Sequence, residues 1–256
     1  MRNSEIVNTD NQQEEKMTIP EYFNNFLEEG YEKYAGYLKG YVDRIGEREL
    51  KDINYSLGNT GYERGLEVAA VYIADALQID KPRIKFQIIE EDKNGIRYGC
   101  DRRDNSIVIR RTPKEKYEDV LAISDAVEMI AHEFWHAHQN NEVNNNSERS
   151  QLYRQEYIKP TDDLEGYYRQ PVELEAYVFG EMVRNKFSKS RKETLMRELD
   201  KTVGAIAECM TNGNEHLVSG FIEDKDIIMK ELREFSEEED DRIRDDKRRQ
   251  FSYIHE

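Results

Sequence analysis

One uninterrupted amphipathic helix, predicted for residues 118–139, constrains the fold of this chain more than any other feature. Its apolar residues recur at alternating steps of three and four positions, as a helix with one buried face requires: Val120, Ile123, Val127, Ile130 and Phe134. No proline or glycine interrupts the segment. The same helix carries the residues His132-Glu133-Phe134-Trp135-His136, an H-E-x-x-H pattern.

The H-E-x-x-H pattern places both histidines one helical turn apart, so both imidazoles can reach one Zn²⁺. Glu133 lies about 100° around the helix and can reach a water bound to that metal. The histidines fall opposite the apolar stripe, so one face packs and the other offers ligands. The alternative, a surface helix with fortuitous histidines, would expose Phe134 and Trp135 to water, which is costly. The pattern therefore indicates a hydrolytic metal site.

Composition excludes several other classes of function. The 256 residues suffice for one large domain with helical attachments, and the formal net charge of −16 argues against nucleic acid as the main partner. Two cysteines, Cys100 and Cys209, form no disulfide framework, which fits a reducing compartment. The chain has neither the apolar core of a signal peptide nor a membrane-spanning apolar run. We therefore expect a cytoplasmic protein with no membrane partner.

The pattern of residue types divides the chain into four predicted segments. Residues 1–17 are polar and are expected to be a disordered tail. Residues 18–55 are expected to be a helix or helix pair docked on the core, since tyrosines and leucines such as Tyr34 and Leu38 recur at heptad-like spacing. Residues 56–190 form the predicted core domain, and residues 191–256 a C-terminal helical extension.

Within the core domain, the periodicity predicts a helix, a short mixed sheet and then the metal helix. The resulting fold class is α+β and mainly α, with additional N-terminal and C-terminal helices. A polar loop is expected after the metal helix. The predicted elements are a helix over 62–77, strands over 84–88, 96–100 and 106–111, the metal helix over 118–139, a loop over 140–150, and helices over 172–186, 192–210 and 215–235.

A catalytic zinc ion normally has three protein ligands, so a third ligand is needed beyond the two histidines. His138 lies about 200° from His136 on the helix and cannot join them. His216 and His255 lie in polar stretches without a motif. A carboxylate near the start of the helix that Pro171 begins is the better candidate, and both Glu173 and Glu175 lie there. They point to different sides of that helix, so only one can bind.

The pair of motifs, H-E-x-x-H and the later Glu173-Leu174-Glu175-Ala176, resembles the gluzincin group of zincin peptidases. Glu-x-Glu-Ala after a loop is most similar to the ImmA/IrrE-type peptidases and, more distantly, to the Ste24/HtpX-type peptidases. The resemblance covers residues 105–185 and implies a zincin-like metallopeptidase domain over 56–190. It implies one Zn²⁺ per chain bound by His132, His136 and Glu173, with Glu175 as the less favoured ligand. Tyr177 departs from those families, which often place Asp or Asn there.

The expected function is zinc-dependent hydrolysis of a peptide bond, with Glu133 as the general base and a peptide or protein as substrate. Tyr177, Tyr168 and Arg169 are the candidates for stabilising the oxyanion, and sequence does not choose among them. The strand over 106–111 is expected to pair with extended substrate, as in that family. A regulatory protein partner is also expected.

Two alternatives come from other classes of protein. The chain could be a catalytically dormant zinc-binding scaffold that acts as an interaction or regulatory protein. Retention of Glu133 argues against this, because a structural site needs no general base. It could also be a helical binding protein in which the motif is fortuitous, and measuring the bound metal would separate these classes.

Overall fold

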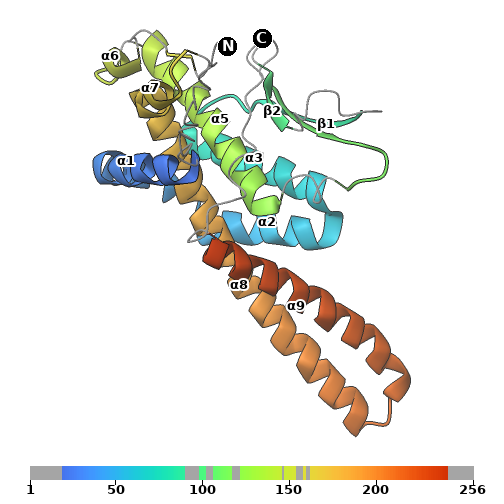
Figure 1. Cartoon of the computed structure of the whole chain (residues 1–256). Coiled ribbons are helices and arrows are strands. Elements are labelled where there is room, and N and C mark those ends of the chain that lie inside the picture. The colour runs from blue at the N-terminus through green and yellow to red at the C-terminus, as the bar shows by residue number, and fades with distance from the viewer. Residues whose placement is uncertain are drawn as a thin grey trace, which may run out of the picture.

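A computed structural model of the chain describes residues 19–89, 98–101, 106–116, 122–145, 147–153, 158–159 and 162–241. The predicted tail over 1–17 lies outside these residues. Helices dominate, and a small sheet lies at one side of the body (Figure 1), so the α+β, mainly α fold class is confirmed. No helix in the described ranges combines the length and the apolar character needed to cross a membrane.

Three helices precede the sheet. They are α1 (Ile19–Val42), α2 (Glu47–Thr60) and α3 (Tyr62–Leu77). The segment expected to be a helix or helix pair contains α1 and the first part of α2, and its tyrosine and leucine stripe contributes to the core: Tyr34 and Leu38 are buried. α2 continues to Thr60, five residues beyond the end of the predicted N-terminal segment. Only Gly61, whose φ of 88° disfavours any residue with a side chain, separates it from α3.

The sheet has three strands in the order β1-β3-β2. β1 (Arg83–Ile88) runs parallel to β3 (Ser106–Arg111), and β2 (Tyr98–Asp101) runs antiparallel to it. The mixed sheet was predicted. β3, the strand expected to pair with substrate, is its central strand: β1 pairs with it over Ser106–Arg111 and β2 over Ser106–Ile109. The backbone of Ser106–Ile109 is therefore already paired on both sides and cannot also pair with substrate.

Two long helices form the centre of the molecule. α5 (Ile123–Asn144) is the predicted metal helix, and α8 (Pro171–Thr211) crosses it. α5 extends five residues beyond the predicted end, into the stretch expected to be loop, because a formed helix tolerates the modest propensity of asparagine. α8 replaces two predicted helices with one of 41 residues, since no proline or glycine interrupts residues 186–192.

Shorter elements join α5 to α8, and one helix follows α8. They are α6 (Ser150–Tyr153), α7 (Leu164–Arg169), the 3₁₀ turn η1 (Glu215–Leu217) and α9 (Val218–Asp241). α8 runs through residue 190, the predicted domain boundary, without a break. Its first half lies in the body against α1, α2 and α5, and its second half leaves the body with α9 (Figure 1).

The close approach of α5 and α8 depends on Gly180. A Cβ atom at this position would lie 2.9 Å from the backbone oxygen of Glu128 and 3.4 Å from Cβ of His132. One turn further along α8, the buried Arg184 guanidinium contacts Asp125 at 3.0 Å and Glu128 at 3.1 Å. Because Gly180 has no side chain and Arg184 pairs with two carboxylates, α5 and α8 are held close together. They meet beside His132, one of the predicted metal ligands.

We predict that Gly180→Ala destabilises the chain by about 1–3 kcal/mol, because the added methyl group meets backbone that cannot move aside. Gly204 lies on the same helix, and a Cβ atom added there would meet no other group within 4 Å. Gly204→Ala should therefore stabilise the chain by about 0.5–1 kcal/mol through helix propensity alone. Urea unfolding of the two variants tests this, and equal effects would show that the helices do not meet at Gly180.

Candidate metal centre

The two histidines of the motif lie one turn apart on α5 and face α8. Their Nε2 atoms are 3.1 Å apart, and their rings are nearly perpendicular, with centroids 4.7 Å apart. Both side chains are largely buried, His136 being the more exposed at 16%. The helix therefore presents two imidazole nitrogens to the same point, as the spacing predicted.

Glu173 comes to this point from the first turn of α8. Gln170, the residue directly before α8, fixes the start of the helix. Its side-chain Nε2 donates to the carbonyl oxygen of Ile158 (3.0 Å), and its Oε1 accepts from the backbone N–H of Ile158 (3.1 Å). Pro171 then occupies the first helical position, where a residue without an N–H costs nothing. Gln170 and Pro171 at the start of α8 thus set the position of Glu173.

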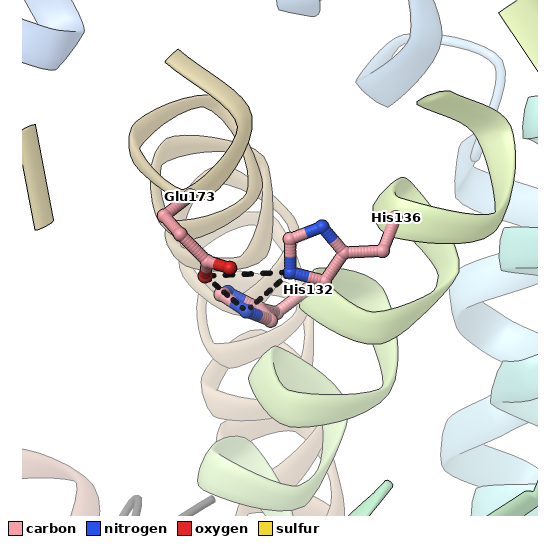
Figure 2. A group of neighbouring side chains, drawn as sticks. All are labelled: His132, His136 and Glu173. Atoms are coloured by element: carbon pink, nitrogen blue, oxygen red, sulfur yellow. Dashed lines mark hydrogen bonds and ion pairs between the residues drawn. The ribbon is translucent and has the colours of Figure 1, made fainter. Parts of the chain in front are cut away.

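The three predicted ligands meet in one buried group (Figure 2). Oε2 of Glu173 lies 3.4 Å from Nε2 of His136 and 3.7 Å from Nε2 of His132. A tetrahedral ion with bonds of about 2.0–2.1 Å holds its ligand atoms about 3.3 Å apart. The observed separations of 3.1, 3.4 and 3.7 Å fit that requirement, so the group could hold a metal ion.

Charge within this group is balanced by a proton when no metal is bound. Burial and the neighbouring His136 lower the pKa of His132, which is therefore neutral. Burial also opposes a charge on His136, but the Glu173 carboxylate outweighs it and raises the pKa of that histidine. The same pairing overcomes burial at Glu173 and lowers its pKa. A buried carboxylate with two imidazoles is a site that gains from a cation.

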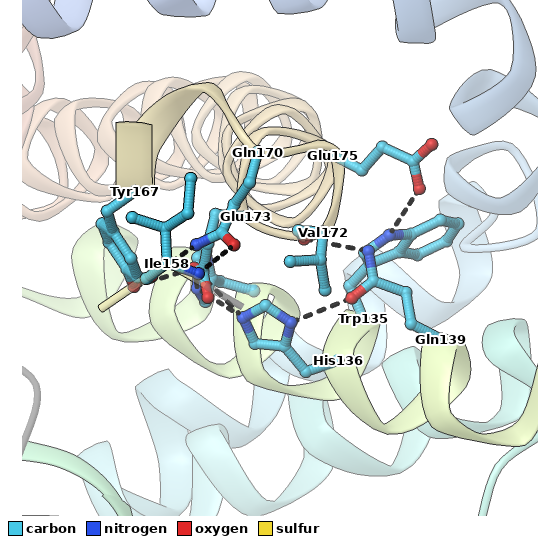
Figure 3. A network of polar contacts seen from close by, with 10 residues as sticks. Trp135, His136, Gln139, Ile158, Tyr167, Gln170, Val172, Glu173 and Glu175 are labelled. Carbon is cyan, nitrogen blue, oxygen red and sulfur yellow. Dashed lines mark hydrogen bonds and ion pairs between the residues drawn. The ribbon is translucent and has the colours of Figure 1, made fainter. Parts of the chain in front are cut away.

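Gln139 fixes the proton of His136 on the correct nitrogen (Figure 3). Its amide nitrogen donates to the carbonyl oxygen of Val172 at 2.9 Å, so its own oxygen must face Nδ1 of His136, also at 2.9 Å. An amide oxygen only accepts, so Nδ1 carries the hydrogen. In the neutral ring the lone pair is then on Nε2, the atom that faces Glu173.

Tyr167 orients the carboxylate ligand. Its hydroxyl donates to Oε2 of Glu173 at 2.8 Å, and the side chain is buried. Neither Tyr167 nor Gln139 was assigned these roles from sequence. The only available signal was position: Gln139 lies three residues after His136, and Tyr167 lies in the short helix before Pro171.

Two polar residues near the site are placed outside it. Glu175, the less favoured ligand, faces the other side of α8, where it pairs with Arg149 and accepts hydrogen bonds from Tyr153 (2.7 Å) and Trp135 (3.4 Å). His138 turns away to the carbonyl oxygen of Leu77, 3.2 Å from its Nδ1. Both sequence expectations, that the two glutamates diverge and that His138 does not join, are confirmed.

The three candidates for oxyanion stabilisation differ in their positions. The ring of Tyr177 lies 4.4 Å from the ring of His132. The ring of Tyr168 lies 5.6 Å from the ring of Tyr177 and 5.2 Å from the ring of Tyr167, and burial and the charge of Glu173 raise its pKa. Arg169 instead lies over the ring of Phe26 at 4.7 Å and pairs with Glu165 at 3.1 Å. The structure brings both tyrosines to the site and turns the arginine away from it.

We predict that Gln139→Ala weakens binding of Zn²⁺, used as the probe ion, by about 10–100-fold, as losses of such outer contacts do. Gln139→Glu should bind with intermediate affinity, since it still accepts from His136 but cannot donate to Val172. Asn140→Ala, at the exposed neighbouring position, serves as the matched control. Competition with a chromogenic chelator measures the affinities, and equal values for all variants would refute the role of Gln139.

A second prediction concerns pH in the metal-free chain. The pKa of His136 is raised and that of Glu173 lowered, so their ion pair contributes fully to stability between about pH 4.3 and 6.5, the ordinary values of the two groups. The contribution is lost as the pH rises through the raised pKa or falls through the lowered one. We expect NMR titration with chelator present to show His136 protonated above pH 6.5 and His132 neutral there. Glu173→Gln should lower the pKa of His136, and an unchanged pKa would contradict the pairing.

Comparison of the chain with protein-family models, with curated proteins and with solved structures finds no match.

Proposed function

We propose that this chain is a zinc-dependent peptide hydrolase. The observation that carries the proposal is the convergence of His132, His136 and Glu173 from two helices, with Glu133 adjacent on the first of them. Two imidazoles and one carboxylate form a donor set that suits Zn²⁺ and that occurs in catalytic rather than structural sites.

The number of ligands supports a catalytic site over a structural one. Structural zinc is closed by four protein ligands, whereas catalytic zinc keeps one position for water. Among the residues that the structure describes, the group contains three such side chains. Glu173 is 1% exposed and His136 is 16% exposed, so water and substrate would approach from the side of His136.

Glu133 is suited to move the proton in this reaction. It lies on α5 between His132 and His136, is 9% exposed, and is not a member of the three-residue group. Its charge also helps raise the pKa of His136. Bound zinc supplies a Lewis acid that acidifies water and polarises the scissile carbonyl. Glu133 would accept the proton of the attacking water and return it to the leaving amine.

Stabilisation of the oxyanion would come from a tyrosine. Tyr168 is the stronger candidate because its ring packs against those of Tyr167 and Tyr177 beside the group and is only partly buried. Tyr177 packs on His132 and is almost fully buried, which suits a role in orienting that ligand. Arg169 is engaged with Phe26 and Glu165 and is not proposed for this role.

We predict that Glu133→Gln keeps stoichiometric zinc and lowers kcat for peptide hydrolysis by about 10²–10⁴-fold, because the general base is lost while the ligands remain. Glu173→Ala should lose both zinc and activity. Glu142→Gln, at the far end of α5, is the matched control and should resemble the wild type. Metal analysis and cleavage of a quenched fluorescent peptide library provide the two readouts.

The same measurements separate the rival functions. Wild-type chain purified without chelator that contains no stoichiometric zinc would refute the metal site. Zinc without cleavage of any library member would instead identify the dormant scaffold. Activity that survives in Glu133→Gln would show that another group is the base.

A further inference from the structure

The C-terminal half of α8 and helix α9 form a two-helix arm that leaves the body of the molecule (Figure 1). We define the arm as residues 195–233. Beyond Leu195 none of its described side chains is fully buried. The two helices meet along half-buried residues at alternating steps of three and four: Leu199, Thr202, Ile206 and Cys209 on α8, and Val218, Phe221, Lys225, Ile228 and Leu232 on α9.

A second apolar stripe follows this seam, offset by one residue on each helix. Residues seven apart are only about 20° apart around a helix, so each stripe is continuous. These side chains are between 38% and 64% exposed: Met196, Val203 and Met210 on α8, and Ile222 and Met229 on α9. The arm thus carries large apolar side chains on its outer surface.

Both stripes lie on one face of the arm. On each helix the seam residues face the other helix. The stripe residues follow them by one position, so each stripe is rotated about the helix axis by about 100° from the seam, toward the next residue. In an antiparallel pair this rotation carries both stripes to the same side. The residues one position before the seam form the opposite face and are mostly charged, including Glu198, Lys201, Glu208 and Asp224. We call the side with Val203 the apolar face.

The width of the apolar surface matches a four-helix bundle rather than a two-helix arm. Two helices alone need only the narrow seam positions, spaced by three and four. A stripe that also includes the next position is typical of helices that contact two neighbours in a bundle. Each helix of the arm therefore has the pattern of a bundle helix with one neighbour present.

The charges on the apolar face favour a second copy of this chain as the partner that covers it. The charged residues in the stripe positions are Asp200, Asp226 and Arg233, a net charge of −1 from two acidic residues and one basic residue, on a chain whose total is −16. A strongly basic partner would be matched by an acidic face, which this is not. A two-fold contact brings the same residues from both copies together, and mixed signs make such a face complementary to itself.

We propose that the apolar face of the arm pairs with the same face of a second copy, which completes an antiparallel four-helix bundle. The face is about 24 Å long and about 20 Å wide from helix dimensions, or about 1,000 Å² for both copies together. That area is at the lower limit of specific interfaces. The dimer should therefore be reversible, with a Kd of about 1–100 μM.

Sedimentation equilibrium of the full chain between about 1 and 300 μM tests the proposal, with a chelator present so that the result is independent of the metal centre. We expect the mass to rise with concentration from 30.4 kDa toward twice that value. Val203→Glu, at the centre of the face, should remain monomeric throughout. Ile227→Glu, 65% exposed on the opposite face, is the matched control and should dimerise like the wild type.

A wild-type chain that stays monomeric at 300 μM overturns the proposal. If Val203→Glu then also loses thermal stability, a segment of the same chain covers the face instead. A Val203→Glu variant that dimerises like the wild type overturns it as well. Circular dichroism checks that each variant keeps its helices, and Met229→Glu, on the other helix of the same face, replaces Val203→Glu if that variant does not fold.

Discussion

The contact between α5 and α8 is the interaction on which the rest of the structure depends. Two members of the group that could hold a metal ion come from one helix and the third from the other, so the group forms only while these helices stay close. Gly180 permits the approach, and Arg184 holds it through two carboxylates on α5. A buried ion pair contributes little net stability but fixes one arrangement when both partners are present.

Hydrogen bonds from neighbouring residues then orient the side chains that meet between the two helices. Gln139 links His136 to the start of α8, and Tyr167 links Glu173 to the helix before it. Each contact joins a ligand to a different element, so a small displacement of either element would cost a buried hydrogen bond. The three side chains are therefore held in place without an ion, which would lower the cost of binding one.

Sequence predicted which three side chains come together because the spacing of the two histidines is set by helix geometry, which is local. His132 and His136 are one turn apart in any helix, and Pro171 marks the start of another. The strand order was not predictable in this way, since the central position of β3 depends on which strands pair in space. Gln139 and Gly180 also carry no local pattern, because their roles arise only where α5 meets α8. α8 was predicted as two helices rather than one because Ser188, Lys189 and Ser190 weaken the helix pattern without breaking the helix.

The continuity of α8 has a mechanical consequence. Glu173 lies in its first turn, and Thr211 ends it near the tip of the arm. Buried side chains hold α8 in the body as far as Leu195. Measured from Leu195 at 1.5 Å per residue, Glu173 is about 33 Å away and the tip about 24 Å away, in opposite directions along one continuous helix. A second chain that immobilised the arm would also steady the carboxylate at the other end.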